Sequence, residues 1–213
     1  MEYTKIPNIF VREQFGNNKL IEGEYATEEL KTLANIPWVW TEKVDGTNIR
    51  VCWDGYRVTF AGRTDKAQIP KEVLSVLESL FGGESKEELF EQTFGTKPCI
   101  LFGEGYGKKI QKNGELYGEP NFIMFDAYVG NTWLLRSDVE TIAEKFGVKC
   151  VPIVNVVTLP EAVEFVRSHP KSNLRDYEME GIVCRPIVEL LSRRGNRIIV
   201  KIKCRDFEKD GLG

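Results

Sequence analysis

Short apolar runs separated by turn residues cover most of the chain, and they predict strands more often than helices. The runs are rich in β-branched and aromatic residues and are bounded by Gly, Asn and Asp, which is typical of strands. They lie at residues 38–44, 48–53, 56–63, 99–104, 121–129, 133–135, 151–157, 179–184 and 197–204. Asp54-Gly55, between the second and third runs, is a strong signal for a two-residue β-hairpin.

Helical spacing of apolar residues interrupts these strands in a few places. Residues 71–81 repeat Val and Leu at helical intervals, and Gly82-Gly83 marks the end of that helix. Gly147 is a helix stop signal, and another helix is expected to reach about Ser168. Three pairs have the capping-box spacing that begins a helix: Ser85 with Glu88, Ser137 with Glu140, and Thr158 with Glu161. Because hairpins outnumber βαβ units, we predict an α+β fold of antiparallel sheets with flanking helices.

Composition places the protein in a reducing compartment. The chain has 213 residues and 42% hydrophobic content, enough for one domain with a core. No apolar stretch approaches the roughly 20 residues of a membrane span, and residues 1–10 lack a signal-peptide core. The five cysteines form no CxxC pair, and His169, the one histidine, is expected in a surface loop. These features favour a cytoplasmic protein without disulfides or a zinc site.

The distribution of charge along the chain is more informative about possible ligands than the net charge of −3. Residues 193–205 contain six basic residues and no acidic one. Such a stretch attracts phosphates locally although the chain as a whole is acidic. The alternative is a solvated edge strand whose lysines only prevent aggregation.

Six segments, taken in order, carry the candidate chemistry. The first is Glu42-Lys43-Val44-Asp45-Gly46-Thr47-Asn48-Ile49-Arg50. The others are Gly62-Arg63-Thr64, Phe102-Gly103-Glu104-Gly105, Phe122-Ile123-Met124-Phe125-Asp126, Glu180-Gly181-Ile182-Val183-Cys184-Arg185, and Lys201-Ile202-Lys203. Together they resemble the covalent nucleotidyltransferase superfamily of polynucleotide ligases and capping enzymes. Within it, the chain is similar to ATP-dependent RNA ligases that seal nicks in duplex RNA.

One departure from the general pattern favours the RNA-ligase branch. DNA ligases and capping enzymes usually carry Arg five residues after the lysine, whereas this chain has Asn48 there. A DNA ligase, a GTP-dependent capping enzyme and a non-catalytic module that holds RNA ends stay open as alternatives. The resemblance implies a single adenylation domain of the ATP-grasp-like nucleotidyltransferase type over residues 1–213, acting as a monomer. It also implies that the second domain appended in larger relatives is not part of these 213 residues.

The resemblance implies a reaction in three steps that uses ATP and Mg²⁺. A lysine, here Lys43, takes AMP from ATP; the AMP passes to a 5′-phosphate RNA end; a 3′-hydroxyl then displaces it. The lysine amine attacks only when unprotonated, and neighbouring positive charge disfavours its ammonium form. Lys201 and Lys203, which share one face of a strand, and a bound metal would supply that charge and hold the phosphates. Arg63 and Asn48 match family positions near the phosphate and the activated end.

The resemblance also assigns residues to the nucleoside. Glu104 is expected to bind the ribose hydroxyls, and its flanking glycines are expected to let a ligand approach the backbone. Phe125 is expected to stack on adenine, with Phe122 as the alternative because alternation sends the two rings to opposite faces. Glu42 is a weaker candidate for recognising the adenine amino group.

Carboxylates and arginines complete the expected site. Glu180 is the first candidate for Mg²⁺, followed by Asp45 and Asp126. Contacts with RNA are expected from Asn48 and from three arginines, Arg185, Arg193 and Arg194. Arg50 has no clear family role and is expected on the surface of its strand.

Overall fold

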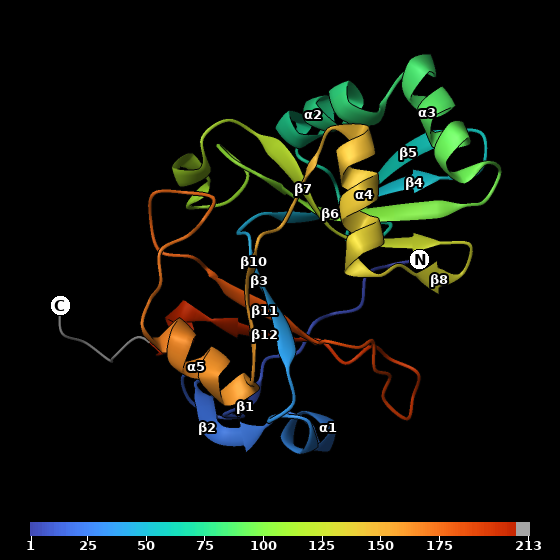
Figure 1. The fold of residues 1–213 in the computed structure, drawn as a ribbon. Helices are drawn as coiled ribbons and strands as arrows, with labels where there is room; N and C mark the ends of the chain where they lie inside the picture. The colour runs from blue at the N-terminus through green and yellow to red at the C-terminus, as the bar shows by residue number, and fades with distance from the viewer. Residues whose placement is uncertain (208–213) are drawn as a thin grey trace. The chain divides into compact units, whose positions relative to one another are not determined.

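A computed structural model describes residues 1–207, which divide into two compact units (Figure 1). Unit 1 consists of Met1–Thr4 and Asp45–Val151, and unit 2 consists of Lys5–Val44 and the chain from Pro152 onward. The prediction of one adenylation domain over residues 1–213 stays a prediction. No helix within residues 1–207 is both long and apolar enough to cross a bilayer.

Unit 1 is built on a six-stranded sheet in which β5, β4, β6, β7 and β8 are neighbours in that order. These pairs are antiparallel, and β9 adds to β7 in parallel. The strands are β4 (Thr47–Trp53), β5 (Val58–Gly62), β6 (Cys99–Tyr106), β7 (Asn121–Val129), β8 (Thr132–Trp133) and β9 (Lys149–Cys150).

Helices α2 (Lys71–Phe81), α3 (Glu84–Phe94) and α4 (Arg136–Phe146) pack on one face of this sheet (Figure 1). A short 3₁₀ helix, η1 (Gly114–Tyr117), lies between β6 and β7. Aromatic rings fill the core between the helices: the centroids of Phe90 and Phe146 are 4.4 Å apart, and Phe81 contacts both. Burial of these rings contributes to the stabilisation of the unit.

Unit 2 contains a four-stranded sheet in the order β10, β3, β11, β12, with all pairs antiparallel. A two-stranded sheet pairs β1 with β2, and Arg12 of β1 donates to Asp206 of η2 at 2.7 Å. The elements are β1 (Phe10–Arg12), β2 (Leu20–Tyr25), α1 (Glu28–Thr32), β3 (Trp38–Glu42), β10 (Ile153–Val157), α5 (Leu159–Arg167), β11 (Gly181–Pro186), β12 (Val200–Lys203) and η2 (Cys204–Phe207).

The core of unit 2 lies between one face of the four-stranded sheet and α5. Trp38 and Trp40 of β3, Ile182 of β11 and Ile202 of β12 are all buried there. Because side chains alternate along a strand, the residues between them point to the opposite face. That face is the one on which the candidate site of unit 2 is built. The predicted α+β class with antiparallel sheets is confirmed.

The helix signals were only partly right. Thr158 and Glu161 form the predicted capping box, and Gly147 ends α4 in the left-handed conformation with φ 68°. The capping boxes at Ser85 and Ser137 are wrong, because each serine is the second residue of its helix. The N-cap residues are Gly83 and Leu135, neither of which makes a side-chain cap bond.

Two further differences concern local structure. The β4–β5 hairpin is present, but the Asp54 N–H donates to the carbonyl of Arg57, so Gly55 and Tyr56 are its central residues. Asp54 Oδ1 accepts the N–H groups of Tyr56 and Arg57, each at 2.8 Å, which explains the one-residue shift. Strand β2 was not predicted because its sequence, LIEGEY, lacks a clear apolar alternation.

The cysteines behave as expected of small hydrophobic side chains. All five thiols are free, and Cys99, Cys184 and Cys204 are buried. Burial raises the pKa of Cys99 to about 12 and that of Cys204 to about 11. These thiols therefore stay protonated near neutral pH and are poor nucleophiles.

Gly103 of β6 is predicted to be intolerant of any side chain. A Cβ there would lie 2.3 Å from Cζ of Phe122 and 2.4 Å from the carbonyl oxygen of Ile123, and the backbone atom cannot move aside cheaply. Overpacking of this kind costs about 1–3 kcal/mol. Thermal unfolding should show the loss for Gly103→Ala, with Ser75→Ala on the exposed side of α2 as control. Equal melting of the two variants would contradict the packing argument.

Candidate active site

Lys43 directly follows strand β3 in unit 2. Its backbone N–H donates to the carbonyl oxygen of Gly181 at 2.9 Å, which extends the β3–β11 pairing by one residue. Trp38 and Trp40 set the register by pointing into the core, so Lys43 falls on the opposite face of the strand. Its side chain keeps 22% of its surface exposed.

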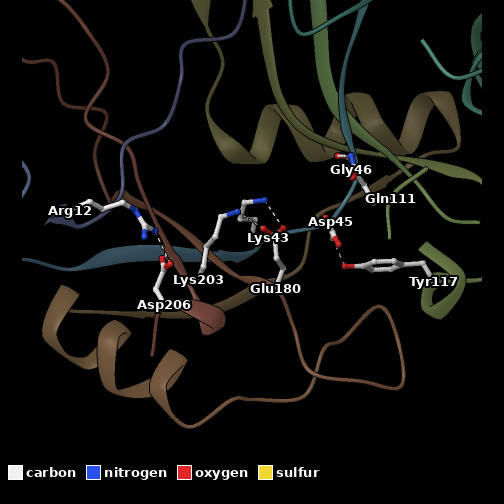
Figure 2. Close-up of polar contacts among 9 residues, drawn as sticks. All are labelled: Arg12, Lys43, Asp45, Gly46, Gln111, Tyr117, Glu180, Lys203 and Asp206. Atoms are coloured by element: carbon white, nitrogen blue, oxygen red, sulfur yellow. Dashed lines mark hydrogen bonds and ion pairs between the residues drawn. The ribbon is translucent and has the colours of Figure 1, made fainter. Parts of the chain in front are cut away.

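Glu180 brings two of the predicted lysines together (Figure 2). Its Oε2 accepts from Lys43 Nζ at 2.5 Å, and its Oε1 accepts from Lys203 Nζ at 2.7 Å. The carboxylate is largely buried, and burial alone would raise its pKa. The charges and hydrogen bonds of Lys43 and Lys203 outweigh that effect and lower the pKa of Glu180. Glu180 is therefore an ionised carboxylate that joins two cationic side chains.

Close packing against β12, the strand that carries Lys203, requires a glycine at position 181. It has φ +150°, and a Cβ there would lie 2.0 Å from the carbonyl oxygen of Ile202. Only glycine lets β11 approach β12 so closely at this point. The close approach of β11 to β12 at Gly181 therefore brings the carboxylate of the preceding residue, Glu180, beside Lys203.

Strand β12 orients its lysines as the sequence predicted. Val200 and Ile202 lie in the core of unit 2, so Lys201 and Lys203 share the opposite face. The backbone of Lys201 also pairs with the segment around Asn8: its N–H donates to the carbonyl of Pro7 at 3.0 Å. That pairing closes the outer edge of β12 and fixes both lysines along a rigid strand.

Glu42 is a buried carboxylate with its own partners. Its side chain accepts from the hydroxyl of Ser172 and from the backbone N–H of Asn173 at 2.8 Å, and the Asn173 amide donates to it at 3.2 Å. With 1% of its surface exposed, Glu42 ties the loop at residues 172–173 to the residue next to Lys43. Recognition of adenine by Glu42 stays a prediction, and in this structure both of its oxygens bind that loop.

In unit 1, the residues after Lys43 are held by two side chains of the segment between β6 and β7. The Asp45 N–H donates to the hydroxyl of Tyr117 at 3.1 Å, and Gln111 Nε2 donates to the carbonyl of Gly46 at 3.0 Å (Figure 2). A Cβ on Gly46 would lie 2.3 Å from the carbonyl oxygen of Gly105. Packing against β6 therefore requires the glycine of the Lys-Val-Asp-Gly segment.

Asn48 and Glu104 are brought together in unit 1. They are direct partners in the β4–β6 register, although they are far apart in the sequence. Asn48 Oδ1 is buried and accepts no hydrogen bond within residues 1–207, so it is a ready acceptor for a ligand donor. The glycines beside Glu104 also have a packing role, because Gly103 is packed by Phe122 and Gly105 by Val73.

Strand β7 separates the two candidate phenylalanines. Phe122 is 2% exposed and belongs to the core beneath α2, so it cannot stack on a ligand without opening that core. Phe125 is half-buried and sits at a β-bulge, with its ring 5.2 Å from that of Tyr3. The prediction for adenine stacking therefore rests on Phe125.

Asp126 is enclosed rather than open to a ligand. It is fully buried, its Oδ2 accepts from the Tyr3 hydroxyl at 2.9 Å, and its Oδ1 accepts from the Ala127 N–H. Tyr3 also packs against Phe102 and Trp133. This geometry favours a structural role for Asp126 over direct contact with a metal.

The predicted arginines lie in different settings. Arg63 is exposed just after β5, and Arg185 is half-buried on the same face of β11 as Val183. Arg193 and Arg194 are exposed in the turn at Gly195, which has φ 76°. Arg50, expected at the surface, is instead 2% exposed, because three acceptors of unit 1 surround its guanidinium.

A metal site made of protein ligands alone is not present in the described part of the chain. Residues 1–207 contain no group of three or more His, Cys, Asp or Glu side chains suited to hold an ion. Mg²⁺ needs few carboxylates because it keeps several of its waters. Glu180, an ionised carboxylate that is not completely enclosed, fits that requirement.

Sequence reasoning missed the residues that support the site. Ser172, Asn173, Tyr117 and Gln111 hold the Glu42–Gly46 segment, and Tyr3 holds Asp126. None of them has a local pattern that would reveal its role. Their partners are far away in sequence, so only the tertiary structure identifies them.

Comparison with known proteins places the chain in a family. The RNA ligase family model matches residues 36–203, well over half of the chain. The chain belongs to the RNA ligase family. The matched region contains Lys43, Asn48, Glu104, Glu180 and Lys203.

Solved structures of an RNA ligase from Naegleria gruberi share the fold. One mutant with ATP and Mn has 17% sequence identity and a TM-score of 0.65, covering 95% of this chain and 56% of that chain. Another mutant, without ligand, has 16% identity and a TM-score of 0.64, covering 98% and 61%. The chain therefore has the nucleotidyltransferase fold predicted from its sequence, and it spans little more than half the length of these ligases.

Proposed function

We propose that this chain is an ATP-dependent RNA ligase that forms a lysyl-AMP intermediate on Lys43. The observation that carries the proposal is the Lys43–Glu180–Lys203 arrangement, in which one buried carboxylate holds two lysines within 2.7 Å. Membership of the RNA ligase family supports it. The Naegleria ligase structures with ATP or AMP and Mn support the choice of nucleotide and of a divalent metal.

In the first step, the unprotonated amine of Lys43 attacks the α-phosphorus of ATP. The Nζ–P bond forms, the bond from that phosphorus to the bridging oxygen breaks, pyrophosphate leaves, and the amine nitrogen loses one proton. Lys203, already fixed by Glu180, and Lys201 on the same strand face would stabilise the negative charge that develops on the phosphates. Because both lysines lie on a rigid strand, little reorganisation is needed during the reaction.

The second and third steps need groups that bind the RNA end. AMP passes from Lys43 to the 5′-phosphate of the RNA, and the 3′-hydroxyl then attacks that phosphate and releases AMP. We assign Asn48, Arg63 and Arg185 to these steps, since amide and guanidinium groups bind phosphate oxygens. For the nucleoside we assign Glu104 to the ribose, Phe125 to adenine, and Glu42 to the adenine amino group as the weaker choice.

Glu180 is the carboxylate proposed to hold Mg²⁺, with Asp45 as a second candidate and Asp126 as a third. The bound ion would supply positive charge beside the α-phosphate. In this structure both Glu180 oxygens are bound by ammonium groups, so metal binding and the Lys43 ion pair compete for one carboxylate. Loss of that ion pair would free the Lys43 side chain to reach the α-phosphate.

Nucleotide labelling tests the proposal directly. The protein is incubated with Mg²⁺ and either α-labelled ATP or α-labelled GTP, and then with nicked RNA, nicked DNA, a broken RNA loop or single-stranded RNA ends. An ATP-derived label on the protein together with RNA sealing is the expected result. A GTP-derived label would favour a capping enzyme, and sealing of DNA alone would favour a DNA ligase. Binding of RNA ends without any label would favour the non-catalytic module.

The turn that carries Arg193 and Arg194 is proposed to contact the RNA backbone. Both side chains are exposed, whereas the nearby Arg197 is occupied by Glu189 at 2.5 and 2.9 Å. Changing both turn arginines to Ala should weaken RNA binding and reduce its log-log salt slope by up to about two. Self-adenylation should be unchanged, since that step needs no RNA.

RNA affinity across a salt series measures this effect. The matched control is the double variant Lys145→Ala and Lys149→Ala, which removes the same charge from exposed positions of unit 1. An unchanged salt slope of RNA binding in the arginine variant would show that Arg193 and Arg194 are solvated and do not contact RNA. An equal change of slope in the control variant would lead to the same conclusion.

A further inference from the structure

Arg50 makes a set of contacts that the proposed reaction does not use. It lies in β4 of unit 1, and its side chain is 3% exposed. Its guanidinium donates through Nε to the carbonyl of Gly62 at 2.7 Å, through Nη2 to Oδ1 of Asp65 at 2.7 Å, and through Nη1 to the carbonyl of Met1 at 3.1 Å. A buried guanidinium with three acceptors is a rigid element of structure.

Two of these acceptors flank Arg63. Gly62 is the last residue of β5, and Asp65 follows Arg63 and Thr64. The same short segment has further anchors: the Asp65 N–H donates to Oε1 of Glu2 at 3.1 Å, and the Ala67 N–H donates to the carbonyl of Thr64 at 3.1 Å. The backbone on each side of Arg63 is therefore fixed, although Arg63 itself is exposed.

The contacts require an arginine rather than any cation. Nε and Nη2 of one planar fork meet a carbonyl and a carboxylate at the same time. A lysine has one donor centre and cannot hold both ends of the segment. The pairing also lowers the pKa of Asp65, chiefly through the hydrogen bond from Arg50, so the carboxylate stays ionised near neutral pH.

We infer that Arg50 is a positioning residue for Arg63, holding the Gly62–Asp65 segment in the geometry in which Arg63 meets phosphate. The inference rests on the proposed function, because Arg63 acquires its role there. Misplacement of a substrate-binding group by about 1 Å costs up to about 100-fold in rate.

Asp65→Ala is the main test, because its side chain is 81% exposed and its loss leaves the core intact. Asp65→Ala should slow the same reaction step that Arg63→Ala slows. The expected decrease in rate is about tenfold, which corresponds to the loss of one charge-assisted hydrogen bond. In an Arg63→Ala background, Asp65→Ala should have no further effect, since there is no longer a side chain to position. Arg50→Lys should behave like Asp65→Ala or worse.

The matched control is Glu140→Ala. Arg136 of the same unit also donates to a backbone carbonyl, that of Val151 at 2.6 Å, and to an exposed carboxylate, that of Glu140 at 2.8 Å. This control removes an equivalent bond away from Arg63 and should leave the rate unchanged. Hydrogen exchange of the amides at residues 63–67, which does not depend on activity, should speed up in Asp65→Ala and not in the control.

The outcomes are distinct. Three results would each overturn the positioning role. The first is a wild-type rate in Asp65→Ala, and the second is a double variant whose loss of rate is the product of the losses in Asp65→Ala and Arg63→Ala. The third is unchanged hydrogen exchange at residues 63–67. Absence of an AMP adduct on the wild-type protein would instead overturn the proposed function, and the assignment of Arg63 would fall with it. Hydrogen exchange would still show in that case whether Arg50 and Asp65 fix the segment.

Discussion

Replacement of Lys43 by alanine is expected to abolish the AMP adduct that forms when the protein is incubated with ATP and Mg²⁺. The Lys43 amine is the proposed nucleophile, whereas Lys201 and Lys203 are assigned to charge stabilisation, so the variant lacks the group that forms the Nζ–P bond. Intact-mass spectrometry should show wild-type protein heavier by one AMP, with peptide mapping placing the adduct on Lys43. The Lys43→Ala protein should keep its unmodified mass.

Two further variants separate chemistry from structure in this experiment. Lys43→Arg keeps a cation beside Glu180 but lacks the nucleophilic amine, so it should fold and carry no adduct. Lys108→Ala removes another carboxylate-paired lysine, bound to Glu119 at 2.7 Å, and should adenylate normally. An adduct on Lys43→Ala would refute the assignment of the nucleophile.

Replacement of Glu180 by alanine is expected to have the second-largest effect, slowing Mg²⁺-dependent adenylation by at least about 100-fold. The carboxylate is the proposed metal ligand, and it also fixes Lys43 and Lys203 at 2.5 and 2.7 Å. Its loss leaves two neighbouring ammonium groups without their shared counter-ion. The rate of adduct formation, measured across a Mg²⁺ titration, should report both effects.

The control for this variant is Glu119→Ala, which removes a glutamate that pairs with a lysine at an exposed position. Thermal unfolding should show that the Glu180→Ala protein is folded. Normal adenylation of Glu180→Ala at limiting Mg²⁺ would remove Glu180 from the metal site, and attention would turn to Asp45.

The site contains residues that local sequence patterns describe correctly and others that they do not. Alternation along β12 correctly placed Lys201 and Lys203 on one face, because Val200 and Ile202 supply an unambiguous apolar side. Alternation along β7 correctly separated Phe122 from Phe125. In both strands the inference needed only neighbouring residues.

The failures occurred where a polar group is satisfied from a distance. Arg50 was expected on the surface of its strand because it has no clear family role, and its acceptors on Gly62, Asp65 and Met1 cannot be foreseen from a strand pattern. Glu42 also has distant partners that local patterns do not reveal, because its carboxylate binds Ser172 and Asn173, which follow 130 and 131 residues later. Its role in adenine recognition stays a prediction.

The sequence by itself determined the class of fold, the family and the order of the reactive segments, because these depend on residue types and short-range spacing. It also determined the capping box of Thr158 and Glu161, whose partners lie three residues apart. The tertiary structure alone decided that Glu180 meets Lys43 across 137 positions, and that core packing requires Gly46, Gly103 and Gly181. Ion pairing and close packing depend on which strands become neighbours, and strand pairing is settled by the burial of the whole core rather than by any local pattern.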